Sequence, residues 1–179
     1  PPDLSAKAKV RLAEWTNLKP DWKNEVLPQL ELEGHLQGTN VNFKGVSALS
    51  AEGSFCLTNA IWTLPDFKVV RPEGNIVFYY ESDSRTQDYY WDFDSSCNPK
   101  DVAPLLGAGA DKALQMFEFN STPHITAKLW GRWRDLTRSG LEARINADNF
   151  VFRKLPIDHV QSLVTYTNGF VRAVDSLVT

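Results

Sequence analysis

The stretch KLWGRWRDLTRSGLEARINADNFVFRKLP, residues 128–156, decides the fold class of this chain. From Leu141 to Asp148, apolar and polar residues alternate without a break. Because successive side chains of a strand point to opposite faces of a sheet, this alternation predicts a β-strand with one apolar and one polar face. Tryptophans and basic residues precede the strand, and no catalytic motif accompanies it.

The same period recurs along most of the chain, which predicts a mainly β fold. Strands are expected at 30–38, 76–80, 89–94, 125–130, 160–167 and 170–174. Asn168-Gly169 predicts a tight hairpin turn between the last two. Strands with one polar face indicate antiparallel pairing. The expected architecture is therefore a curved antiparallel sheet or groove, or a sandwich.

One segment interrupts the strand pattern with helix-forming residues. Asp111 to Met116 favours helix, and Asn98 or Asp101 is positioned to cap its start. Pro104 and the pair Gly107 and Gly109 are expected to split this helical insert into two pieces. A shorter helical turn is expected at 21–26.

The features on either side of the insert occur in the same order. Residues 35–38 (HLQG) correspond to 128–131 (KLWG), about 90 residues later, and Glu52 then aligns with Glu142 and Asn59 with Asn149. This predicts two related multi-strand units. The expected organisation is an N-terminal segment 1–29 packed on the sheet, a first β unit 30–97, a helical insert 98–120 and a second β unit 121–179, all in one structural domain.

Composition excludes some classes of protein. The 179 residues carry 19 basic and 22 acidic side chains, interspersed, for a net charge of −3. A nucleic-acid binder usually has a clustered basic surface, so no nucleic-acid partner is expected. Cys56 and Cys97 are compatible with one disulfide or with two free thiols. The start at Pro1-Pro2, without methionine, suggests a processed chain or a piece excised from a longer one.

The run from His124 to Arg172 resembles the repeat of AsmA-like proteins, the relatives of TamB. In that repeat a strand ends in a glycine and W-x-D-L, and an alternating strand ends in an aromatic pair. A P-hydrophobic-D turn follows, and the next strand closes on Y-x-N-G. The matching residues are Gly131, Trp133, Asp135, Leu136, Phe150, Phe152, Pro156, Ile157, Asp158, Tyr166, Asn168 and Gly169.

The resemblance implies a long β-groove with an apolar interior and a polar exterior, which carries phospholipid through the periplasm of a Gram-negative-type cell envelope. It implies a membrane-anchored parent protein, a role in lipid transport or outer membrane biogenesis, and no enzymatic activity or cofactor. The expected partners are phospholipid or another acyl-chain lipid, and neighbouring segments of a longer chain or other envelope proteins.

Alternation and resemblance together select the candidate residues. The apolar strip that would hold acyl chains comprises Leu30, Leu32, Leu36, Ile125, Ala127, Leu129, Leu141, Ala143, Ile145 and Ala147. The candidates for contact with anionic head groups are Lys128, Arg132, Arg134 and Arg138. The same apolar residues also fit an ordinary core closed by a second sheet or by the helical insert.

Two other functions remain open from the sequence. One is a β-sandwich that binds carbohydrate, with Trp130 as the best stacking candidate because it falls on the polar face of its strand. The other is a structural spacer without a ligand. Asp92 and Asp94 share a strand face, and such acidic pairs are usually solvated. The three histidines lack ligand spacing, so no metal site is expected.

Overall fold

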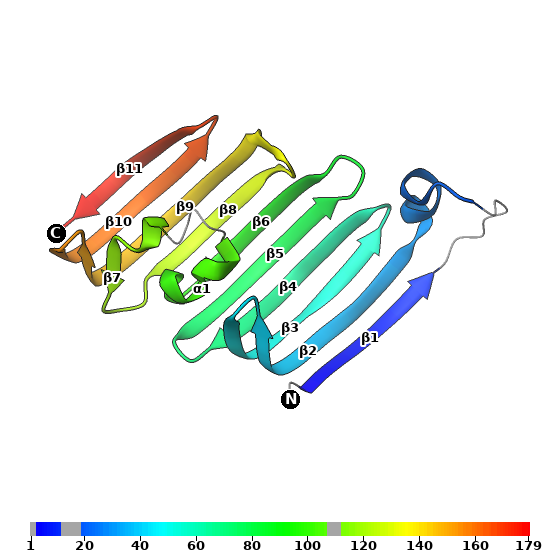
Figure 1. Cartoon of the computed structure of the whole chain (residues 1–179), viewed down its shortest axis with the longest axis horizontal. Coiled ribbons are helices and arrows are strands. Elements are labelled where there is room, and N and C mark those ends of the chain that lie inside the picture. Colours follow the sequence, from blue (N-terminus) through cyan, green and yellow to red (C-terminus); the bar gives the residue numbers. More distant parts are fainter. Residues whose placement is uncertain (1–2, 12–18, 107–111) are drawn as a thin grey trace.

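The computed structural model describes residues 3–11, 19–106 and 112–179, and these form one open antiparallel sheet (Figure 1). The expected curved antiparallel sheet is thus confirmed. The strands are β1 (Asp3–Arg11), β2 (Glu31–Phe43), β3 (Val46–Thr58), β4 (Ile61–Arg71), β5 (Gly74–Asp83), β6 (Asp88–Ser95), β7 (Phe117–Phe119), β8 (His124–Arg132), β9 (Asp135–Phe152), β10 (Leu155–Thr167) and β11 (Phe170–Val178).

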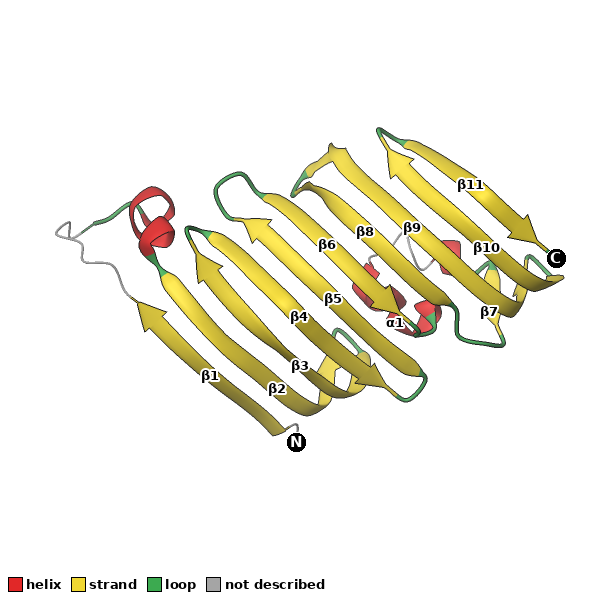
Figure 2. Ribbon diagram, turned by 180° about the vertical axis from the view of Figure 1, so that it is seen from behind, coloured by secondary structure: helices red, strands yellow, loops and turns green. Residues whose placement is uncertain are grey.

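Strand order in the sheet follows the order of the sequence. The path runs β1-β2-β3-β4-β5-β6-β8-β9-β10-β11, and the short β7 pairs with the end of β9. β1 and β11 form the two opposite edges (Figures 1 and 2). Residues 3–11, expected to pack on the sheet, are its first strand and pair with β2 from Asp3↔Thr39 to Arg11↔Glu31.

The alternation from Leu141 to Asp148 forms the predicted strand, with one apolar and one polar face. On β9, half-buried or buried residues alternate with exposed ones throughout this stretch. Ala143 lies opposite Ala127 of β8 on one side and Val164 of β10 on the other. The predicted turn at Asn168-Gly169 is also confirmed, with positive φ at both residues (51° and 79°), as a tight hairpin requires.

Two long hairpins curl toward the face on which α1 (Pro99–Leu106) lies (Figure 1). The β2–β3 hairpin has Asn40 at φ 50°, and the β9–β10 hairpin has Asn149 at φ 48°. Asparagine tolerates this left-handed conformation, which bends a strand locally. The tip of the second hairpin is Arg153-Lys154, whereas Pro156 to Asp158 lies within β10. The turn expected at Pro156–Asp158 is therefore wrong.

The helical elements agree only in part with expectation. The turn expected at 21–26 is the one-turn helix η1 (Trp22–Val26), capped by the Asp21 side chain and followed by η2 (Leu27–Gln29). Asn98 caps α1, since its Oδ1 accepts from the backbone N–H of Lys100 (3.1 Å). Pro104 lies inside α1, so the break expected there is wrong. Gly107 and Gly109 lie outside the described residues, and 112–114 is helical.

The two cysteines are free thiols. Cys97 lies two residues before the start of α1 and is buried, and this burial raises the pKa of its thiol. Cys56 lies on β3 and is partly exposed. The disulfide that the sequence left open is therefore not formed.

Candidate functional site

One face of the sheet is a continuous apolar surface made by the inward positions of successive strands. Register places apolar residues opposite one another across six strands, β4 to β6 and β8 to β10. The first row is Leu64, Tyr80, Trp91, Leu129, Leu141 and Tyr166. The second row is Phe67, Phe78, Phe93, Ala127, Ala143 and Val164.

Aromatic rings in contact form the centre of this apolar face. The ring centroids of Phe67 and Phe78 are 5.1 Å apart, those of Phe78 and Trp91 are 5.3 Å apart, and those of Tyr80 and Trp91 are 4.3 Å apart. Such spacing is typical of favourable aromatic pairs. The rings come from β4, β5 and β6, so the face is aromatic in the middle and aliphatic toward β9.

A bulge in β4 brings Phe67 onto this face. The β4–β5 register shifts between Leu64 and Phe67, which lets both residues point to the same side although they are three apart. Asp66 is held there by the backbone N–H of Ser54 (2.8 Å) and by the Ser54 hydroxyl (3.2 Å). Gly53 leaves room for the ring, because a Cβ at that position would lie 2.6 Å from Cδ2 of Phe67.

The apolar face is only half-buried. Every large residue of the two rows keeps an intermediate exposure, whereas the fully buried set is small and consists mostly of alanines and a few aliphatic residues. The whole chain exposes 11918 Å². A compact protein of 20.2 kDa would expose about 8,800 Å². The chain therefore exposes more surface than a compact protein of its mass, as expected for a single-layer sheet and not for a closed two-layer core.

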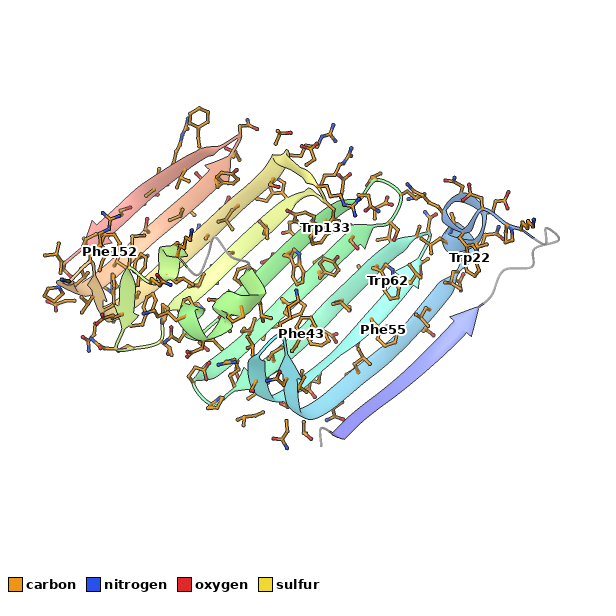
Figure 3. All side chains as sticks on the ribbon, viewed as in Figure 1. Trp22, Phe43, Phe55, Trp62, Trp133 and Phe152 are labelled. Carbon is orange, nitrogen blue, oxygen red and sulfur yellow. The ribbon has the colours of Figure 1, made fainter. Side chains whose placement is uncertain are left out.

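The helix α1 lies over this face and covers a part of it. Val102 and Ala103 of α1 are buried, whereas Leu105 is exposed. Phe55 and Trp62 lie on the same side as α1 and are beyond its reach (Figure 3). The second sheet that would close an ordinary core is absent from the described part of the chain.

The structure brings nine of the ten predicted strip residues onto the apolar face. Leu32 lies opposite Leu57, and Leu36 lies opposite Gly53. The seven strip residues of β8 and β9 belong to the same surface, where they lie opposite one another or opposite residues of β10. Leu30 instead ends η2 directly before β2 and is half-buried. Sequence reasoning missed the aromatic centre, although Tyr89, Trp91 and Phe93 alternate with polar residues in the strand expected at 89–94.

The predicted head-group residues do not form one free basic cluster. Lys128 lies on the polar face, opposite Asp92 and Glu142. Arg132 donates two hydrogen bonds to Asp88 (2.7 and 3.2 Å), which lowers the pKa of that carboxyl to about 2. Arg138 pairs with Asp135 at 3.6 Å. Arg134 is exposed in the β8–β9 turn.

The opposite face of the sheet is polar and pairs charges across strands. His124 of β8 contacts Asp94 of β6 at 2.9 Å, and His159 of β10 contacts Asp148 of β9 at 2.6 Å. Residues of β8, β9, β10 and β11 line an open hollow of about 420 Å³. Its polar lining residues include Arg144, Asn146 and Gln161. Among the described residues, no three histidine, cysteine or acidic side chains gather as metal ligands would.

Comparison with protein-family models, with curated proteins and with solved structures gives no match to this chain. No helix within the described ranges has the length and apolar composition needed to cross a membrane.

Proposed function

We propose that this chain binds acyl chains on its apolar face, as a non-enzymatic segment of an AsmA-like, TamB-related groove protein. Its role would be phospholipid transfer in the periplasm, in support of outer membrane biogenesis. The observation that carries this proposal is the large apolar face that no second layer covers in the described residues. Exposed apolar surfaces of this extent usually mark binding sites.

The two apolar rows fit an extended hydrocarbon chain. Six adjacent strands span roughly 24 Å, since strands lie about 4.8 Å apart. A phospholipid chain spans about half of a hydrocarbon core that is about 30 Å thick, so it fits along a row. Each methylene removed from water contributes about 0.8 kcal/mol, so binding needs only a continuous apolar path. No nucleophile, acid or base is required.

The same observations are less favourable to the alternatives. A structural spacer would need no uncovered apolar face. A carbohydrate module would be favoured by exposed tryptophans in one plane, whereas Trp62 and Trp91 belong to the apolar face and Trp130 to the opposite one. Lipid binding is therefore the function that the apolar face supports best.

The test is native mass spectrometry of the chain purified without detergent, followed by lipid extraction and by titration with phospholipid. We expect near-stoichiometric phospholipid on the unmodified chain and its loss in the double variant Ala143→Asp, Ile145→Asp, which places two carboxylates on the apolar face. Arg144→Asp, Asn146→Asp is the matched control, because it puts two carboxylates on the opposite face of the same strand.

The circular dichroism spectrum of each variant establishes that it still folds. Equal lipid binding by both folded double variants would contradict the apolar face as the site. Absence of binding by the unmodified chain, with added phospholipid as well, would favour the spacer.

A further inference from the structure

The polar face carries an aromatic and acidic patch that the lipid role does not use. This Trp130 patch comprises Tyr79, Glu81, Tyr90, Asp92, Trp130 and Glu142. The pairing of β5, β6, β8 and β9 brings these six residues next to one another on the polar face. Glu81, Tyr90 and Trp130 lie opposite one another on β5, β6 and β8, and the next row contains Tyr79, Asp92, Lys128 and Glu142. The patch lies in the middle of the sheet, away from both edges.

Trp130 provides a fixed platform in this patch. It lies opposite Gly140 of β9, and a Cβ at Gly140 would come within 2.4 Å of Cε2 and Cζ2 of the indole. The glycine therefore lets the ring lie directly against the backbone of the next strand. The side chain still exposes 36% of its surface to solvent. A large indole held in place and exposed on a polar face is suited to stacking with a ligand.

Two tyrosines fix the carboxylates beside the platform. The rings of Tyr79 and Tyr90 meet edge to face with centroids 6.1 Å apart. The Tyr79 hydroxyl donates to Glu81 at 2.6 Å, and the Tyr90 hydroxyl donates to Asp92 at 3.4 Å. These bonds leave other lone pairs of both carboxylates free to accept.

The patch has a net negative charge. Its three carboxylates, Glu81, Asp92 and Glu142, outnumber the one ammonium group beside them, Lys128, which leaves a formal charge of −2. The electrostatic effect reaches the phenols: the hydrogen bond to Glu81 raises the pKa of Tyr79 to about 12, and burial and then Asp92 raise the pKa of Tyr90. The surface thus favours a ligand that has cationic groups.

We propose that the Trp130 patch binds a saccharide that carries free amino groups. The indole stacks on the C–H face of a sugar ring, and the flanking carboxylates accept hydrogen bonds from the ammonium and hydroxyl groups. A sugar ring combines a flat apolar face with several donors, which matches a flat platform between acceptors. A lysine side chain has one donor group on a flexible stem and matches the platform less well.

The binding experiment uses isothermal titration calorimetry of the whole chain with a glucosamine tetrasaccharide, whose amines are free. The N-acetylated tetrasaccharide and tetralysine are the comparison ligands. We expect the free-amine sugar to bind at least tenfold more tightly than either. Equal affinity for the acetylated sugar would overturn the role of the ammonium groups, and equal affinity for tetralysine would overturn the role of the sugar ring.

Two matched pairs of variants locate the site. Trp130→Ala should weaken binding at least tenfold. Trp133→Ala should not, because Trp133 is 50% exposed but lies outside the patch, where it contacts Tyr89 in a tilted arrangement with ring centroids 4.6 Å apart. Glu81→Gln, Glu142→Gln keeps the platform and should also weaken binding, whereas Glu118→Gln on β7 should not. Unchanged affinity in both patch variants would overturn the proposal.

The saccharide site and the lipid face are tested independently, because they lie on opposite faces of the sheet. The variant Ala143→Asp, Ile145→Asp should keep its affinity for the free-amine sugar. Loss of sugar binding in that variant, with the fold intact, would place the sugar on the apolar face and overturn the assignment to the Trp130 patch.

Discussion

At the scale of single residues, the sheet depends on a few glycines that make room for large rings. Gly53 accommodates Phe67 on the apolar face, and Gly140 accommodates Trp130 on the polar face. In both cases the neighbouring aromatic ring occupies the space in which a Cβ would lie. Glycine usually destabilises the interior of a strand, but here each glycine makes room for an aromatic side chain of the next strand.

Gly140→Ala should lower the free energy of unfolding by about 1–3 kcal/mol, because the added methyl group overlaps the indole of Trp130. The measurement is urea denaturation followed by circular dichroism. In a double-mutant cycle the cost should largely disappear when Trp130 is already alanine. A cost that is the same with and without the indole would contradict this contact.

A second prediction at this scale concerns the Asp88–Arg132 pair. The hydrogen bond from Arg132 lowers the folded-state pKa of Asp88 to about 2, below the value of about 3.9 for an unfolded aspartate. Its stabilising contribution is therefore complete above pH 4 and is lost as the pH falls through 2. Urea midpoints at pH 5 and pH 2.5 should differ less in Asp88→Asn than in the unmodified chain. An equal difference would contradict the prediction.

At the scale of elements, the two curled hairpins depend on asparagines at positive φ. Asn40→Val should lower the free energy of unfolding by about 1–2 kcal/mol, since a β-branched residue is strained in this conformation. Asn40→Gly should stay within about 1 kcal/mol of the unmodified chain. Thr39→Val, in the same strand, is the control. Chemical denaturation measures all three, and an equal effect of valine at 39 and 40 would contradict the role of φ.

The sequence analysis predicted β2, β5, β6 and β8 to β11, but it did not predict β1, β3, β4 or β7. It failed where the period breaks. In β4, which was not among the expected strands, the bulge at Asp66 shifts the apolar position by one, so that Leu64 and Phe67 share a face although they are three residues apart. In β9, Asn149 has a positive φ, and the buried positions pass from Ala147 to Phe150 without a shift in register. Pro104 was expected to interrupt the helical insert, but it lies inside α1 and the helix continues to Leu106.

The candidate site was predictable in its aliphatic half only. The strip residues of β8 and β9 follow from local periodicity, which a single strand reveals. The aromatic centre depends on three further strands being adjacent and in register. Local periodicity does not contain that information. Charge partners such as Asp88 for Arg132, 44 residues apart, are likewise fixed by register.

At the scale of the whole molecule, a single-layer sheet has a measurable shape. A compact chain of 179 residues has a radius of gyration of about 16 Å. The open sheet exposes far more surface than such a protein, so small-angle X-ray scattering of the monomer should give a clearly larger value. A radius near 16 Å would show that the apolar face is closed in solution and would contradict the groove.

The agreement between strand order and sequence order has a consequence for how the chain reaches this shape. Each strand of the path except β8 pairs with the strand synthesised directly before it, so most pairing partners are local. Such a sheet can form in the order in which it leaves the ribosome, one hairpin at a time. Its stability then approximates a sum over neighbouring strands, as in solenoid proteins. Evolution can therefore lengthen or shorten the sheet by whole hairpins without redesigning a common core.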